Sequence, residues 1–389
     1  MSSWYFWAAV KEGRRIMHYL DNAATTRPSE AAVAALTRAA TVCYGNPSSL
    51  HALGFEAEHE LREARRSVAK ALGTQPERIV FTGSGTEASN LALFGLADRR
   101  RGSKLITTDA EHPAVLETLR AVAQRGGFTL HLLSTAGGAP SLDEAAALID
   151  DDTALVAMML VNNETGAIFP VREVGALVQK TRARFHVDAV QAFGKLPFAP
   201  EGLLCHSLAV SAHKIGGVKG VGALWLAKGV SPSPVIYGGG QERGLRSGTE
   251  PMPAIAAFGA AAGEYAARYA AAGIPALREA AVKGLLELGC VINQPPVVCP
   301  SILNFSVPGL RAEPMLHLLS QRGVYLSSGS ACSSHKKGAS HVLVAMGLPE
   351  PLLRGALRVS FGPDNTMQDV QALLGGISAC QTTLAREDV

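Results

Sequence analysis

The sequence has 389 residues, of which 47% are hydrophobic, 18% charged and 6% aromatic. At roughly 150 residues per domain, this length predicts two or three domains, and the composition excludes a disordered chain. Lys and Arg number 36 against 33 Asp and Glu, a balance that predicts neither nucleic acid nor a membrane as a partner. The 6 cysteines stand singly, which argues against a disulfide framework or a zinc knuckle and predicts a cytoplasmic protein.

Residues 1–16 place their basic residues after an apolar stretch, which is the reverse of the order in a signal peptide. We therefore interpret them as an N-terminal extension that carries no targeting signal. From residue 75 on, short β-rich runs alternate with stretches of helical period. This alternation predicts an α/β fold with a mostly parallel sheet covered by helices on both faces. The predicted strands are 79–81, 105–107, 129–133, 154–160 and 185–187, and the predicted helices include 87–97 and 115–124.

A second, smaller domain is predicted to begin near the end of an Ala-rich helical stretch. New strand-like runs follow at 301–307 and 358–361. We therefore expect a large domain formed by residues 25–264. We expect a smaller α+β domain formed by residues 1–24 and 265–389.

Three polar segments follow predicted strands, where ligands bind in parallel sheets. Residues 82–87 open a helix with small side chains, which suits a phosphate, although an ordinary turn with Thr86 as the helix cap is the alternative. Asp188 ends a strand among apolar residues and could pair with a pyridinium nitrogen or cap the next helix. Lys214 follows another apolar run and could form a Schiff base or extend to solvent. In this order, the three segments are typical of a pyridoxal-phosphate protein.

Cys332 lies in a Ser- and Gly-rich run, residues 326–338, for which we expect an exposed loop. The histidine and two lysines at 335–337 favour its thiolate, which is the nucleophilic form. Among the 11 histidines no metal-ligand spacing is found. We expect only His112 and His213 to lie near a site.

With these residues in order, the chain resembles a cysteine desulfurase of the class V aminotransferase-like, fold-type I pyridoxal-phosphate enzymes. The resemblance covers about residues 18–362 and implies the large and small domains of that transferase fold. It rests on many ordered segments. Besides the Cys332 run, they include YLDNAATT at 19–26, GNPSS at 45–49, TE at 86–87, EH at 111–112, VNNETG at 161–166, HVDAVQ at 186–191, SAHK at 211–214, GGGQERG at 238–244, RSGT at 246–249 and RVSFG at 358–362.

The resemblance implies a catalytic set of Lys214, Cys332 and His112. Lys214 would hold pyridoxal 5′-phosphate as an imine and move the substrate α-proton, and His112 would stack on the ring. Asp188 would pair with the ring nitrogen, and Gln191 would bond the phenolic oxygen. The implied cofactor-binding residues are Gly85, Thr86, His112, Asn163, Asp188, Gln191, Ser211, Ala212, His213, Lys214 and, from the neighbouring subunit of a homodimer, Thr249. Ala212 stands where the family pattern often has Gly.

The implied reaction transfers sulfur from L-cysteine to Cys332 as a persulfide and releases L-alanine. Arg358 would grip the substrate carboxylate with its planar fork. The implied substrate-binding residues are Asn22, Ala23, Asn163 and Arg358. The expected partner is a sulfur acceptor or an iron–sulfur scaffold protein, with a transient iron–sulfur contact at Cys332 and no intrinsic metal. The alternative is a selenocysteine lyase, or another lyase of this class, that uses no protein persulfide.

Overall fold

The computed structural model describes residues 17–329 and 339–385. Within this part, one sheet contains β2 (Ile79–Thr82), β3 (Lys104–Thr108), β4 (Thr129–Leu133), β5 (Thr153–Met159), β6 (Arg184–Asp188), β7 (Ser207–Ser211) and β8 (Gly222–Leu226). The strand order is β2-β8-β7-β6-β5-β3-β4. β8 runs antiparallel to both of its neighbours, and the other neighbouring pairs are parallel. The mostly parallel sheet expected from the sequence is therefore confirmed.

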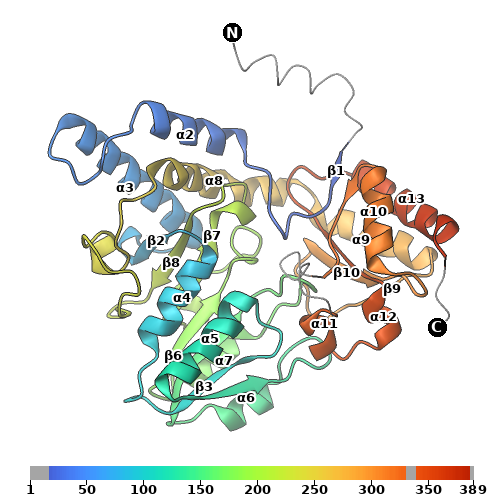
Figure 1. Cartoon of the computed structure of the whole chain (residues 1–389), viewed down its shortest axis with the longest axis horizontal. Coiled ribbons are helices and arrows are strands. Elements are labelled where there is room, and N and C mark those ends of the chain that lie inside the picture. Colours follow the sequence, from blue (N-terminus) through green and yellow to red (C-terminus); the bar gives the residue numbers. More distant parts are fainter. Residues whose placement is uncertain (1–16, 330–338, 386–389) are drawn as a thin grey trace.

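Helices cover both faces of this sheet (Figure 1). On one face lie α4 (Gly85–Leu96) and α5 (Pro113–Gly126), and on the other lie α3 (Ala52–Leu72), α7 (Val171–Val178) and α8 (Met252–Ala271). Successive side chains of a strand point to opposite faces. Leu105 and Leu155 therefore join the hydrophobic cluster of α4 and α5, whereas Ile106 and Val156 join the cluster on the opposite face.

A second group of strands lies beside the large sheet (Figure 1). It contains β1 (His18–Tyr19), β9 (Val291–Ile292), β10 (Ile302–Ser306), β11 (Val324–Tyr325) and β12 (Ala356–Ser360). β10 pairs antiparallel with β9 and β12, and β1 pairs in parallel with β11. The remaining helices are α2 (Glu30–Thr41), α6 (Leu142–Leu148), α9 (Ile274–Glu287), α10 (Ala312–Gln321), α11 (His341–Ala345), α12 (Glu350–Arg354) and α13 (Met367–Thr383).

The N-terminal strand β1 thus pairs with a strand from the C-terminal part of the chain. Asp21 adds a further bridge to Ser360 at the end of β12. The predicted boundary at residue 265 falls inside α8, which continues unbroken through it. The exact division into two domains stays a prediction.

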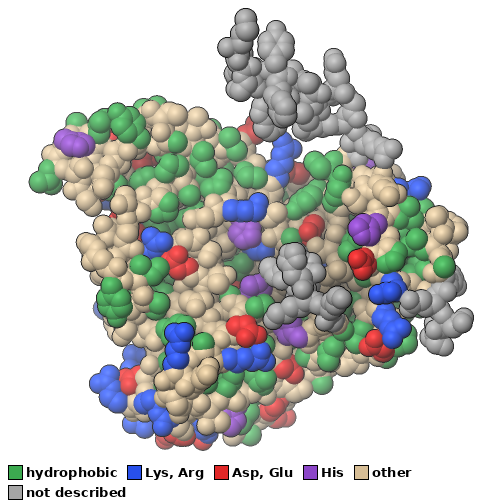
Figure 2. Space-filling model, in the orientation of Figure 1, with side chains coloured by type: hydrophobic (Ala, Val, Ile, Leu, Met, Phe, Trp, Pro, Cys, Tyr) green, Lys and Arg blue, Asp and Glu red, His purple; other side chains and the backbone are tan. Residues whose placement is uncertain are grey.

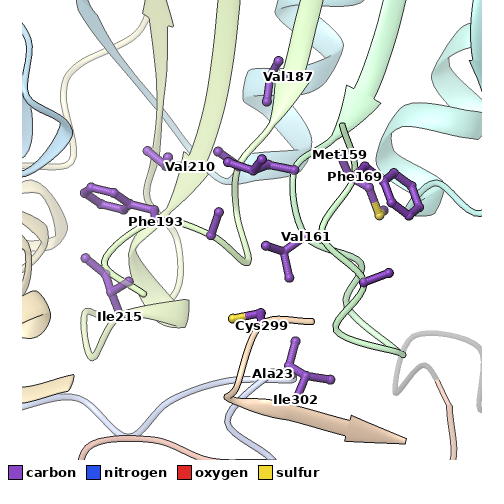
Figure 3. Close-up of a cluster of buried hydrophobic side chains, with 14 of the residues drawn as sticks. Ala23, Met159, Val161, Phe169, Val187, Phe193, Val210, Ile215, Cys299 and Ile302 are labelled. Atoms are coloured by element: carbon purple, nitrogen blue, oxygen red, sulfur yellow. The ribbon is translucent and has the colours of Figure 1, made fainter. Parts of the chain in front are cut away.

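Buried hydrophobic side chains join the large sheet to the smaller one (Figure 3). Ala23, Val161, Cys299 and Ile302 are each at most 2% exposed and belong to one core cluster. Figure 3 shows Cys299 between Val161 and Ala23, with Ile302 beside it. This packing fixes the first residues and β10 against the strand ends of the large sheet, so residues from both parts can form one site.

Candidate active site

Four neighbouring parallel strands end at one edge of the large sheet, and a predicted site segment follows or ends each of them. His112 comes after β3, Asn163 comes after β5, Asp188 is the last residue of β6, and Ser211 is the last residue of β7. Because the carboxyl ends of parallel strands meet at the same edge, the fold brings these four positions together. The sequence predicted this grouping.

Lys214 ends the short helix η3 (Ala212–Lys214), which directly follows β7. Its Nζ donates hydrogen bonds to the carbonyl oxygens of Ala23 at 2.6 Å and Ala24 at 2.8 Å. The Lys214 charge also lowers the pKa values of Asp188 and His112, which indicates that the three side chains share one space. The amine is held on interior carbonyls, so the alternative of a lysine extended to solvent is wrong.

Asp188 is a buried carboxyl at the centre of this edge. Burial raises its pKa to about 6, while a hydrogen bond from the Val190 N–H at 2.9 Å and the Lys214 charge favour the carboxylate. The residues after it form turns, so the alternative in which Asp188 caps a helix is wrong. A carboxylate in such a setting gains most from a cation placed against it.

His112 is fixed by its place at the start of α5. It is the N-cap residue, Pro113 follows at the first helical position, and Gly127 ends the helix in the left-handed conformation. His112 Nδ1 accepts a hydrogen bond from the Ala114 N–H at 3.1 Å. Burial, Lys214 and His341 lower the His112 pKa to about 4. The imidazole is therefore neutral at pH 7, with its proton on Nε2.

The predicted phosphate turn begins α4. Ser84, and not Thr86, is the N-cap, because the Ser84 hydroxyl accepts from the Glu87 N–H at 3.1 Å. A Cβ on Gly85 would lie 2.8 Å from Val190 Cγ2 and 3.4 Å from Ser211 Cβ. Gly85 therefore keeps the start of α4 close to the ends of β6 and β7, with Thr86 exposed beside it.

The loop that carries Thr249 lies against this turn. Arg246 Nε pairs with Glu87 Oε1 at 2.7 Å, and Glu87 Oε2 accepts from the Gly83 N–H at 2.9 Å. Thr249 itself is exposed. Its predicted contact with the phosphate of a neighbouring subunit stays a prediction.

His213 and Ala212 lie between β7 and Lys214. His213 Nδ1 is 3.2 Å from the Thr25 hydroxyl, and burial lowers its pKa to about 4, assisted by nearby lysines. Ala212 is fully buried, and a Cβ on Gly217 would lie 2.9 Å from its methyl group. The missing side chain at Gly217 makes room for the methyl group that stands where the family pattern often has Gly.

Arg358 reaches the same edge from β12 and is 1% exposed. Its Nη2 pairs with Asp21 Oδ1 at 2.8 Å, and its Nη1 donates to the Asn163 carbonyl at 2.9 Å. The backbone of Arg358 also exchanges two hydrogen bonds with Ser327, at 2.7 and 3.2 Å. Arg358 and Asn163 are thus together, as predicted.

The predicted residues Asn22, Ala23 and Gln191 make different contacts. Ala23 contributes its carbonyl oxygen, which accepts from Lys214 and from Gln191 Nε2 at 2.9 Å. Asn22 donates its side-chain N–H groups to the Ser360 carbonyl and to Asn365, so its amide nitrogen holds the end of β12. A direct substrate contact by Asn22 stays a prediction.

Cys332, the predicted sulfur acceptor, lies outside the described residues. Within the described part, no three His, Cys, Asp or Glu side chains form a group that could hold a metal ion. The helices described also include none of the length and hydropathy needed to span a membrane.

Two buried ionisable groups were missed as site residues. Glu111 is fully buried, and its Oε1 accepts from the Met159 N–H and the Thr108 hydroxyl, both at 2.9 Å. Burial raises its pKa to about 8, so it is mostly neutral at pH 7. Lys195 is the other, and its Nζ donates to Gln191. The only feature of the sequence that could have pointed to Lys195 was its position four residues after Gln191.

Comparisons with known proteins identify the family of the chain. A family model described as aminotransferase class-V matches residues 18–373. The cysteine desulfurase IscS of Methanosarcina thermophila is 37% identical over 362 residues, which cover 92% of this chain and 90% of the relative. A solved NifS-like protein has a TM-score of 0.89 and 38% identity, covering 95% of this chain and 100% of that chain. A structure of SspA in complex with cysteine has a TM-score of 0.78 and 30% identity, covering 90% and 100%.

The chain belongs to the aminotransferase class-V family, whose members in general depend on pyridoxal phosphate. Relatives named cysteine desulfurase match most of its length. The fold type and the cysteine desulfurase function predicted from the ordered motifs are therefore confirmed.

Proposed function

We propose that the chain uses pyridoxal 5′-phosphate bound to Lys214 to transfer sulfur from L-cysteine to Cys332. The observation that carries this proposal is the convergence of Lys214, Asp188 and His112 at the carboxyl edge of the large sheet. The family's general dependence on pyridoxal phosphate and the cysteine desulfurase relatives support it. The cysteine bound in the related SspA structure supports the substrate.

The residues at this edge fit the cofactor. The buried Asp188 carboxyl, with its pKa raised to about 6, would be stabilised as a carboxylate by a cationic ring nitrogen. Gly85 leaves space where a Cβ would approach Val190 and Ser211. The N–H groups at the start of α4 and the Ser211 hydroxyl are suitable donors for a phosphate.

When bound, pyridoxal phosphate supplies an electron sink that stabilises negative charge on the substrate α-carbon. Lys214 Nζ would take the α-proton, since this amine lies at the same sheet edge as Asp188 and His112. His112 adds no positive charge, because its pKa of about 4 keeps it neutral and leaves an N–H on Nε2. Arg358 binds the substrate carboxylate, with its guanidinium plane held by Asp21 and the Asn163 carbonyl.

Cys332 acts as the sulfur nucleophile in its thiolate form. It attacks the substrate sulfur, so that an S–S bond forms and the substrate Cβ–S bond breaks. The electron pair of the broken bond passes to the substrate carbon, which takes up a proton and leaves as the methyl group of alanine. The persulfide on Cys332 is then transferred to an acceptor, which we propose is an iron–sulfur scaffold or another sulfur carrier.

We propose that two copies form a homodimer through the connection between α2 and α3. Tyr44, Leu50 and Phe55 are 65%, 90% and 56% exposed, and Figure 2 shows hydrophobic side chains over this part of the surface. Tyr237, 79% exposed, lies in the segment that leads to Thr249. Covering these side chains with a second copy removes apolar surface from water and brings Thr249 to the neighbouring subunit.

We place the reaction in the cytoplasm. Cys43, Cys205, Cys290, Cys299 and Cys380 are all free thiols in the described part of the chain. Unpaired cysteines are typical of a reducing compartment.

The first test measures alanine and sulfide release from L-cysteine with reductant, together with the visible absorption of the purified protein. Lys214→Ala should abolish both turnover and the visible band of the cofactor linkage. Cys332→Ala should keep the band and lose turnover. Lys228→Ala and Cys290→Ala serve as matched controls, since they change an exposed lysine and a buried thiol away from the site and from the proposed dimer surface.

Each outcome separates one part of the proposal. A colourless, inactive wild type after incubation with pyridoxal phosphate would contradict the cofactor assignment. Full turnover by Cys332→Ala would contradict the persulfide role and favour the selenocysteine lyase type of mechanism, which uses no protein persulfide.

A further inference from the structure

Lys195 is a second lysine buried behind the site, and the proposed mechanism does not use it. It is 8% exposed and follows β6 in the same run of turns as Gln191. Its Nζ donates a hydrogen bond to Gln191 Oε1 at 3.0 Å. Burying a lysine amine without a hydrogen-bond partner is costly. The contact with Gln191 offsets part of this cost.

The charges around Lys195 come from both parts of the fold. Burial is the main cause that lowers the pKa of Lys195 to about 8. Cys299, on the segment before β10, raises this pKa, and Arg358, on β12, lowers it. At pH 7 the amine is therefore mostly protonated. Whether charged or neutral, it presents N–H groups to Gln191 Oε1.

The contact continues from Gln191 to the cofactor lysine. Gln191 Nε2 donates to the Ala23 carbonyl at 2.9 Å, and the same carbonyl accepts from Lys214 Nζ at 2.6 Å. Lys195, Gln191, Ala23 and Lys214 thus form one continuous chain of hydrogen bonds. Buried chains of this kind specify the orientation of every member.

The two ends of the Gln191 amide are fixed by opposite partners. If the amide flipped, Gln191 Nε2 would face the N–H groups of Lys195 and Oε1 would face the Ala23 carbonyl. Both contacts would then be repulsive, donor against donor and acceptor against acceptor. Without the Lys195 amine, only the Ala23 carbonyl would favour the observed orientation.

We propose that Lys195 is a positioning residue that locks the Gln191 amide with its NH2 group toward Ala23 and Lys214. One amide hydrogen is used by Ala23, and the second can bond the phenolic oxygen of the bound cofactor. This inference rests on the proposed function, because it assigns Lys195 a role toward pyridoxal phosphate. Lys195 acts only through Gln191 and does not touch the substrate.

The test compares Lys195→Met, Lys195→Arg and the control Lys180→Met, an exposed lysine on the same domain. The readout is the pH titration of the visible absorption of the cofactor-loaded protein. In Lys195→Met, the Gln191 amide is no longer locked, so the phenolic oxygen loses a firm N–H donor and the visible form should keep its proton to higher pH. We expect the midpoint to rise by about 0.5 to 1 pH unit, the size of one net hydrogen bond.

A double-mutant cycle distinguishes positioning from a merely structural role. If Lys195 acts through Gln191, the Lys195→Met shift should disappear in a Gln191→Ala background. Lys195→Arg keeps an N–H donor and should restore most of the wild-type midpoint. kcat/KM for L-cysteine should fall about three- to tenfold in Lys195→Met.

The outcomes separate this inference from the proposed function. A wild type that gives no visible band with pyridoxal phosphate would overturn the proposed function itself. A wild type with a normal band, but with the same midpoint in Lys195→Met, would overturn the positioning role alone. A Lys195→Met shift of equal size with and without Gln191 would also overturn it. If Lys195→Met does not fold, Lys195→Ala, which also removes the amine, takes its place in the titration, and an unchanged midpoint in that variant would overturn the positioning role.

Discussion

Replacing Glu111 by Gln should change the pH dependence of stability in a defined direction. Glu111, which immediately precedes His112, is fully buried, and its Oε1 accepts hydrogen bonds from the Met159 N–H and the Thr108 hydroxyl. Its Oε2 has no hydrogen-bond partner in the described part of the chain. Gln has the same shape and keeps the Oε1 acceptor, so the substitution mainly removes the ionisable proton.

The expected magnitude follows from the two pKa values. The usual pKa of 4.5 rises to about 8 in the folded protein, chiefly through burial. Between these values the unfolded chain releases a proton that the folded chain retains, so raising the pH stabilises the unfolded state. At about 1.4 kcal/mol per pH unit, going from pH 5 to pH 8 should lower the unfolding free energy of the wild type by about 3 to 4 kcal/mol relative to Glu111→Gln.

Urea unfolding of both apo proteins at pH 5 and pH 8, followed by tryptophan fluorescence, measures this difference. Other titrating groups are shared by the two proteins and cancel in the comparison. Glu111→Gln should gain stability over the wild type as the pH rises. A difference between the two proteins that is the same at pH 5 and pH 8 would refute a buried, neutral Glu111.

Three further substitutions test the site and the dimer. Arg358→Lys loses the planar fork that contacts Asp21 and the Asn163 carbonyl, so the KM for L-cysteine should rise about 10- to 100-fold in steady-state assays; an unchanged KM would contradict the carboxylate role. Asp188→Asn removes the carboxylate that would face the ring nitrogen, so the cofactor Kd from absorption titration should rise by about the same factor, and an unchanged Kd would count against that pairing. Leu50→Arg places a charge on a side chain that is 90% exposed and should convert the dimer to monomers in sedimentation velocity; a dimer of wild-type stability would remove this surface from the interface.

The positions of the strand-end residues could be predicted because local sequence decides them. The buried runs before His112, Asp188 and Ser211 are short and apolar, and the polar residue that ends or follows each run marks the sheet edge. Gly85 was also readable, because a small residue at a strand-to-helix turn permits close approach. These assignments need no knowledge of distant contacts.

Contacts between distant segments could not be predicted in the same way. Arg358 meets Asp21 across 337 positions, and Lys214 meets the Ala23 carbonyl across 191. The cap of α4 was assigned to Thr86 as the alternative, but the structure uses Ser84, because either hydroxyl satisfies the same sequence signal. Lys195 was overlooked because its burial is a tertiary feature, and two of the groups that shift its pKa, Cys299 and Arg358, lie on segments far along the chain.

The strand order brings an anion-binding turn and a buried carboxylate to the same edge of the large sheet. The start of α4 packs against β8, since a Cβ on Gly222 would lie 2.7 Å from the Gly85 nitrogen, and Asp188 ends β6, two strands away. The same turn also lies close to the ends of β6 and β7, where a Cβ on Gly85 would meet Val190 and Ser211, and the end of β7 leads to Lys214. A ligand that satisfies both the turn and the carboxylate must carry an anionic group and a cationic group on separate atoms. Pyridoxal phosphate carries both groups, in its phosphate and its ring nitrogen, which supports the proposed cofactor.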